Sequence, residues 1–152
     1  MAVSDLTQHE LFDAIVQEIL GSISGIHLSN VILDPKSTPN TRQHKVFSID
    51  MQTVNTQKYR DHKDRRVRME SSTTIRILHR MNPKDQTLTQ KTALNDEQNV
   101  IAALMTTTRA PLNYTRVSYR ATRRAIHGSQ EWLMTDVTFS IEYDFELAPV
   151  LA

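Results

Sequence analysis

The sequence contains no cysteine, which excludes disulfide bonds, zinc–thiolate sites and thiol nucleophiles. Only three glycines occur, so no glycine-rich phosphate loop, dinucleotide-binding fingerprint or nucleophile elbow is present. No apolar run approaches the roughly 18 residues of a membrane span, and the first residues lack a basic segment followed by an apolar one. These absences lead us to expect a soluble protein that folds in a cytoplasm and does not enter a membrane.

The size and charge of the chain suit one ordinary globular domain. A length of 152 residues is enough for a single hydrophobic core, and we assign residues 1–152 to one domain. The formal net charge of +1 argues neither for nor against a polyanionic partner, because only local clustering of basic residues could make that case. The six histidines are scattered at no metal-ligand spacing. We therefore expect no metal, no cofactor and no enzymatic activity.

The stretch from Glu131 to Leu147 has the clearest periodicity in the chain. Apolar side chains occupy the odd positions from Val137 onward, and acidic or hydroxyl side chains lie between them. Because a strand turns alternate side chains to opposite faces, one face is apolar and the other acidic. At about 3.3 Å per residue this stretch would span roughly 50 Å, two to three times a usual strand. We predict a strand that bends or reaches beyond its own domain.

The first helix is predicted from apolar residues at three-and-four spacing between Leu11 and Ile23. Residues 7–10 fit a capping box before it. Gly21 and Gly25 follow as stop signals, since glycine tolerates the left-handed conformation that ends helices.

The second helix is predicted to begin near Asn95, a good N-cap followed by two acidic residues in the first turn. Pro111 terminates it. Periodicity leaves residues 87–94 undecided between helix and loop.

Three further strands complete the predicted fold. Lys45–Val54 and Val67–Met81 alternate apolar with polar residues, and 112–124 pairs with 131–147 across the loop 127–129. The order α-β-β-α-β-β predicts an α+β domain with a four-stranded antiparallel sheet. Both helices cover its apolar face, and long hairpins extend from the core.

The final hairpin has a predicted register. In an antiparallel hairpin, the numbers of any two paired residues add up to the same total. The apolar residues of both strands share one face only if this total is even, and a three-residue loop around Gly128 makes it 256. The expected pairs are Val117 with Phe139, Thr115 with Ile141, and Arg120 with Asp136.

Clusters of charge supply the candidate interface residues. The polar segment 55–66 is interpreted as an exposed arm or loop. The first basic cluster lies in this segment and just after it: Lys58, Arg60, Lys63, Arg65, Arg66 and Arg68. The second lines the final hairpin: Arg116, Arg120, Arg123 and Arg124. The carboxylates expected near it are Asp136, Glu142 and Asp144. Solvated surface with cross-strand pairing, phosphate contact, and contact with a neighbouring subunit all stay open.

The element order and three segments carry a family resemblance. Residues 80–86 (Arg-Met-Asn-Pro-Lys-Asp-Gln) lead to residues 95–104 (Asn-Asp-Glu-Gln-Asn-Val-Ile-Ala-Ala-Leu), and a long hairpin follows with residues 132–139 (Trp-Leu-Met-Thr-Asp-Val-Thr-Phe). With the capped first helix and two strands, this pattern resembles the tail terminator proteins of tailed bacteriophages. The resemblance spans nearly the whole chain.

The resemblance implies a structural virion protein, assembled in the host cytoplasm, with no catalytic residues. Such proteins form homo-oligomeric rings, hexamers, that cap the tail tube, end its polymerisation and join it to head–neck connector or stopper proteins. DNA would pass transiently through the ring. Over-long strands agree, because strand edges that leave a domain are suited to pairing with a neighbour.

Two alternatives remain at the level of sequence. One is another neck, stopper or tube protein that shares this architecture. The other, of a different class, is a monomeric α+β domain that binds nucleic acid through its two basic arms, which would make its affinity fall steeply with salt.

Overall fold

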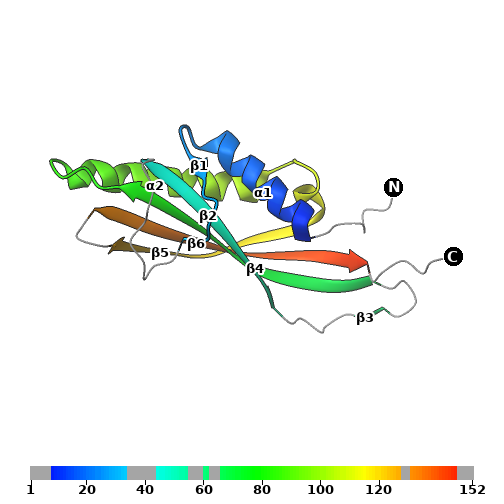
Figure 1. Cartoon of the computed structure of the whole chain (residues 1–152). Coiled ribbons are helices and arrows are strands. Elements are labelled where there is room, and N and C mark those ends of the chain that lie inside the picture. Colours follow the sequence, from blue (N-terminus) through cyan, green and yellow to red (C-terminus); the bar gives the residue numbers. More distant parts are fainter. Residues whose placement is uncertain (1–7, 34–43, 55–59, 62–65, 128–130, 147–152) are drawn as a thin grey trace.

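Two long central strands, β4 (Arg66–Arg80) and β6 (Trp132–Glu146), organise the sheet (Figure 1). The computed structural model describes residues 8–33, 44–54, 60–61, 66–127 and 131–146. Within these residues the protein is α+β, with helices α1 (Gln8–Ser22) and α2 (Gln86–Thr106) on one side of the sheet. The main strand order is β1-β2-β4-β6-β5, and β3 pairs with β4 outside that path. The other elements are β1 (His27–Leu28), β2 (Lys45–Val54), β3 (Arg60–Asp61), β5 (Arg116–His127) and the 3-10 turn η1 (Leu112–Tyr114).

The predicted four-stranded antiparallel sheet is wrong, because the sheet is mixed and has further strands. β1 pairs in parallel with β2 through His27 opposite Val46 and Leu28 opposite Phe47. The ladders β2–β4, β4–β6 and β6–β5 are antiparallel. Two residues carry too short a pattern to announce a strand, so β1 exists through its tertiary contact with β2 rather than through its own sequence.

The main core lies between the helices and one face of the sheet. Alternation along β4 and β6 turns Ile75, Ile77, Val137, Phe139 and Ile141 toward the helices, and each is fully buried. These side chains pack with apolar residues of both helices in one cluster: Leu11, Ala14, Ile15, Val16, Ile19, Val100 and Leu104. The predicted apolar face of β6 is therefore the helix-covered face.

The helix boundaries differ from the sequence prediction at the start of α2, which is earlier than expected, and at Gly21, which does not end α1. α2 begins at Gln86, with the Asp85 side chain accepting a hydrogen bond from the Leu88 backbone N–H, so Asn95 is not the N-cap. Residues 87–94 are helical, which the periodicity had left open. Gly21 lies inside α1, and Gly25 has a φ of 74°, the left-handed conformation expected of a helix stop signal. The capping box at residues 7–10 starts outside the described residues.

The predicted register of the final hairpin is also wrong. Val117 lies opposite Ile141 and Tyr119 opposite Phe139, two positions away from the expected pairs. A β-bulge follows at Arg120, so the pairing resumes with Ala121 opposite Thr138. Because of the extra residue, odd-numbered side chains of β5 lie on the helix-covered face before the bulge and even-numbered side chains lie there after it. β5 also begins at Arg116, because η1 occupies residues 112–114.

A smaller apolar cluster lies on the sheet face opposite the helices, which we call the open face. Leu33 reaches this face, where its backbone N–H donates to the Ser48 hydroxyl. It packs with apolar side chains from three strands: Val46, Leu78, Trp132 and Met134. The Arg80 guanidinium lies 5.9 Å from the ring centroid of Trp132, within cation–π range. The segment that follows β1 therefore wraps around the edge of the sheet.

The core assignment predicts opposite outcomes for two adjacent substitutions. Phe139→Asp places a charge on the fully buried helix face at a cost of several kcal/mol. Thr138 is half-buried on the open face, so Thr138→Asp should lower the free energy of unfolding by much less. We expect cooperative thermal unfolding, followed by circular dichroism, for the Thr138 variant only. A well-folded Phe139 variant would show that the core face has been assigned wrongly.

Candidate functional site

The open face carries a ladder of opposite charges across its strands. Register places Arg76 opposite Asp136 and Arg68 opposite Asp144, in adjacent strands β4 and β6. Such directly opposed charges attract one another across an antiparallel pair. The described charged residues on this face are Asp50, Arg68, Glu70, Arg76, Arg80, Arg116, Arg120, Arg123, Asp136, Glu142 and Asp144.

The Arg76–Asp136 pair is the best formed of these contacts. The guanidinium donates through Nε to Oδ1 at 2.7 Å and through one terminal nitrogen to Oδ2 at 2.9 Å. Its other terminal nitrogen donates to the Leu33 carbonyl. Both charged side chains are mostly buried, with exposures of 19% and 25%. This two-pronged contact ties the wrapped segment to the centre of the sheet.

The outer pairs are looser. Arg68 Nε lies 3.2 Å from Asp144 Oδ1 with both side chains nearly half exposed, and Arg120 lies 3.7 Å from Glu70 Oε1. Glu70 also accepts a hydrogen bond from the Ser140 hydroxyl. The acidic stripe predicted on β6 is thus a salt-bridged strand face. In the part of the chain that the structure describes, no group of three potential metal ligands comes together.

A shallow pocket of about 230 Å³ opens where β5 begins beside β6. The chain enters β5 there through η1, and β6 continues past it. Charges of both signs and polar groups line the pocket: Arg68, Asn113, Tyr114, Thr115, Arg116, Glu142, Tyr143 and Asp144. This mixed lining gives no strong preference for an anion or a cation.

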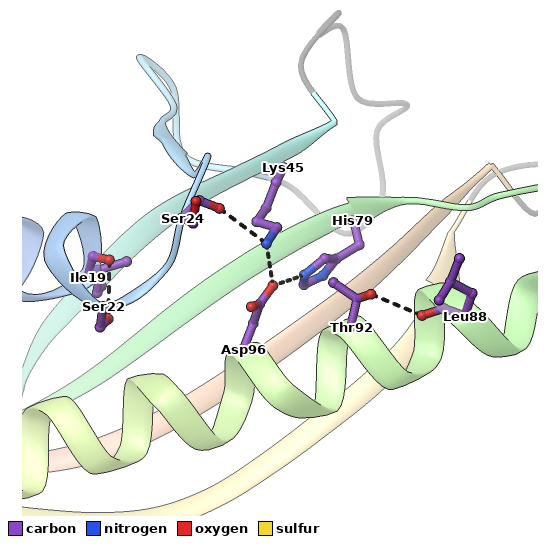
Figure 2. A network of polar contacts seen from close by, with 8 residues as sticks. All are labelled: Ile19, Ser22, Ser24, Lys45, His79, Leu88, Thr92 and Asp96. Atoms are coloured by element: carbon purple, nitrogen blue, oxygen red, sulfur yellow. Dashed lines mark hydrogen bonds and ion pairs between the residues drawn. The ribbon is translucent and has the colours of Figure 1, made fainter.

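A second polar cluster is buried between the helix layer and the sheet (Figure 2). Asp96 points from α2 toward β2 and β4, where its Oδ2 accepts hydrogen bonds from His79 Nε2 at 2.6 Å and Lys45 Nζ at 2.8 Å. Asp96 and His79 are almost fully buried. His79 Nδ1 is also buried and has no hydrogen-bond partner among the described residues. The cluster fixes α2 to two strands at once.

The ionisation of Asp96 depends on its two partners. Burial alone would raise the pKa of its carboxyl group, but hydrogen bonds from His79 and Lys45 and the positive charge of Lys45 outweigh burial and lower that pKa. Asp96 is therefore a carboxylate at neutral pH. Because these buried contacts tie α2 to two strands, we interpret the cluster as a structural anchor.

Arg124, a predicted interface residue, also anchors α2 to the sheet. Arg124 donates to Glu97 Oε2 on α2 at 2.8 Å and to the Thr135 hydroxyl. The bulge at Arg120 causes this, because it turns Arg124 onto the helix-covered face. The predicted pairing of Arg120 with Asp136 is likewise wrong, since Asp136 binds Arg76.

The remaining candidate interface residues separate into two groups. The structure brings together Arg116, Glu142 and Asp144 where β5 begins beside β6, while Arg120 contacts Glu70 of β4, the residue opposite Glu142. Lys58, Lys63 and Arg65 lie outside the described residues. Arg60 and Arg66 lie in paired strands β3 and β4, and only their backbone is described. The proposed role of the arm at 55–66 therefore stays a prediction.

Several polar residues of these sites were missed from the sequence. His79 follows Ile75 and Ile77 at an inward-facing position, and Asp96 lies four residues before Val100 on the buried stripe of α2. Polar residues at apolar positions were the available signal for this cluster. Arg76 gave no such signal, because an arginine on an alternating strand is expected at a surface.

No protein-family model matches the sequence, and a search of curated proteins also returns no match. No described helix is long and apolar enough to cross a membrane.

The Asp96 cluster predicts a defined pH dependence. Asp96→Asn should lower the free energy of unfolding by about 3 kcal/mol at pH 7, because it breaks a buried ion pair. The folded pKa lies below the unfolded value of about 3.9, so ionised Asp96 contributes its full stability above that pH. This contribution is lost as pH falls through the folded pKa. Urea unfolding should show a gap to wild type that is present at pH 7 and narrows below about pH 4.

The matched control for that series is Asp13→Asn, since Asp13 is an exposed carboxylate of α1. It should leave the stability curve close to wild type. A gap between wild type and Asp96→Asn that persists unchanged down to pH 3 would contradict the assigned ion pair.

The open-face pairs predict unequal coupling energies. A double-mutant cycle with Arg76→Ala and Asp136→Ala should give a coupling of about 2 kcal/mol, because the contact is two-pronged and mostly buried. The same cycle on Arg68 and Asp144 should give less than about 1 kcal/mol. Chemical denaturation measures both. Equal coupling energies for the Arg76–Asp136 and Arg68–Asp144 pairs would contradict the prediction that the more buried pair is the stronger one.

Proposed function

We propose that this protein is a structural subunit of a phage tail, a terminator that forms a ring on the end of the tail tube. The ring ends polymerisation of the tube and joins it to the head–neck connector. Its site of action is the virion, and the tube and connector proteins are its partners. The sequence resemblance to tail terminators motivates the proposal, and the following geometry supports it.

The supporting observation is that β4 and β6 are longer than their neighbours. β2 ends at Val54, opposite Glu70, and β5 begins at Arg116, opposite Glu142. Beyond these points residues 66–69 and 143–146 continue as a two-stranded ribbon, with β3 beside β4. Figure 1 shows this ribbon extending past the N-terminal end of α1. At its base Tyr143 belongs to the main core and Met69 packs against that core. Beyond these two residues no described strand lies on the outer side of β6. A ribbon that leaves the core in this way suits a subunit stacked between tube and neck, where another molecule can pack on it.

The charge arrangement favours protein partners over a polyanion. On the open face Arg68, Arg76 and Arg120 each have a carboxylate nearby on the same face: Asp144, Asp136 and Glu70. Pairing within the face reduces the positive potential that phosphate binding needs. The monomeric nucleic-acid-binding alternative is thus the weaker proposal.

Light scattering across a range of concentrations tests the proposal. We expect a mass six times the 17.5 kDa of one chain, and we expect this ring to stop elongation when added to growing tail tubes of the cognate virus. Fluorescence anisotropy with labelled DNA is the control. A monomer that binds DNA with an affinity falling steeply in salt would overturn the proposal in favour of the nucleic-acid alternative.

A further inference from the structure

The two lateral sides of the domain are built from different elements. On one side, Gln8 at the start of α1 donates to the Thr53 hydroxyl of β2 as well as to the Tyr143 hydroxyl of the central strand β6, and the chain passes from α1 into β1 at the sheet edge. On the other side, α2 contacts β5 and β6. We call these the α1 side, formed by α1, β1 and the outer edge of β2, and the β5 side, formed by β5 and the adjoining flank of α2.

The β5 side exposes apolar side chains beside an unpaired strand edge. Leu94 and Met105 lie about three turns apart on one stripe of α2. This stripe is on the same flank as Glu97, which reaches Arg124 of β5. Tyr119 and Ile126 of β5 are exposed on the same sheet face. Among the described residues no strand pairs with the outer edge of β5.

The α1 side exposes a second apolar set at the opposite end of the sheet. Glu18 faces α2, where it accepts hydrogen bonds from Thr107 and Arg109. Leu20 lies about 200° further around α1 and so points away from α2. Leu28 in β1 and the following residues Val31 and Ile32 are exposed at the same edge, the last two by 69% and 66%. The β2 edge from Ile49 to Val54 has no outer partner strand among the described residues.

The charges of the two sides are opposite. β5 contains four arginines and no carboxylate, and three of them are exposed: Arg116, Arg120 and Arg123. α1 contains three carboxylates and no lysine or arginine, with Glu10 and Asp13 exposed on its outer surface. Two β5 sides facing each other would oppose arginine to arginine, which disfavours a two-fold dimer through this strand. When a β5 side faces an α1 side in the same orientation, these open-face arginines meet the open face of β2, where the described charged residue is Asp50. The α1 carboxylates lie on the other side of the sheet, in the helix layer.

Strand direction agrees with the same pairing. Three successive antiparallel ladders make β5 run opposite to β2. A second copy placed in the same orientation beside β5 would therefore present its β2 edge antiparallel to β5, the geometry that extends an antiparallel sheet.

We propose that the β5 side of one copy docks on the α1 side of the next copy, in a head-to-tail contact. This inference rests on the proposed ring and names the surfaces that build it. The contact joins the apolar set Leu94, Met105, Tyr119 and Ile126 to the set Leu20, Leu28, Val31 and Ile32. Because the two surfaces differ, each copy can bind one neighbour on either side, as closure of a ring requires.

Two variants, each blocked on one side, test the contact. Arg123→Glu with Ile126→Glu blocks the β5 side, and Leu20→Glu with Ile32→Glu blocks the α1 side. All four side chains lie at exposed positions, so both variants should melt cooperatively by circular dichroism. The control is Lys84→Glu with Leu88→Glu at the start of α2, which matches the β5-side variant in charge change and in loss of an exposed apolar residue.

Light scattering should give a single-chain mass for each blocked variant alone, at a concentration where wild type and control are oligomeric. An equimolar mixture of the two blocked variants should give a mass of two chains, because each supplies one intact side. Blocked variants that still form the wild-type oligomer, or a mixture that stays monomeric, would overturn the proposed contact while leaving the ring itself standing. A wild-type chain that stays monomeric up to millimolar concentration would overturn the contact and the proposed function together.

Discussion

The pairing of β4 with β6 is the constraint on which the rest of the structure depends. Fifteen residues of each strand lie in unbroken antiparallel register, so every side chain on both strands is assigned to one of two faces. One face becomes the core beneath the helices, and the other carries the Arg76–Asp136 pair. A slip of one residue would move Phe139 to the open face and Asp136 into the core. The alternating sequence therefore fixes both the fold and the position of its charged surface.

The helix layer is held to this sheet by polar contacts as well as by the core. Asp96 joins α2 to β2 and β4, and Glu97 joins it to β5. Consecutive residues of a helix point about 100° apart, so Asp96 and Glu97 reach strands on opposite lateral sides of the same, helix-covered face. Ion pairs that are mostly buried lose much of their strength if either partner moves, which makes them sensitive to helix orientation. They keep the lateral flanks of α2 in fixed positions, with Leu94 and Met105 beside β5.

The sequence predicted those parts of the fold in which a long periodic pattern agrees with tertiary structure. The apolar face of β6, the core stripe of α1 and the bounds of β2 follow from period and length. The bulge at Arg120 could not be predicted, because no glycine marks it and its cause is the fit between strands. The start of α2 was placed too late because its first turns are mostly polar, although Asp85 offered an N-cap. The Lys45–His79–Asp96 cluster required knowledge of which strands lie under α2, which periodicity within one element cannot supply.

The central claim is that this domain works as a ring subunit, and electron microscopy of the purified protein tests it most directly. Two sides of opposite character, on a sheet with two unpaired edges among the described strands, favour a closed circle of like-oriented copies. Two-dimensional class averages should show rings with six-fold symmetry around a central opening. Particles with two-fold symmetry, each made of two copies joined through equivalent surfaces, would contradict the account.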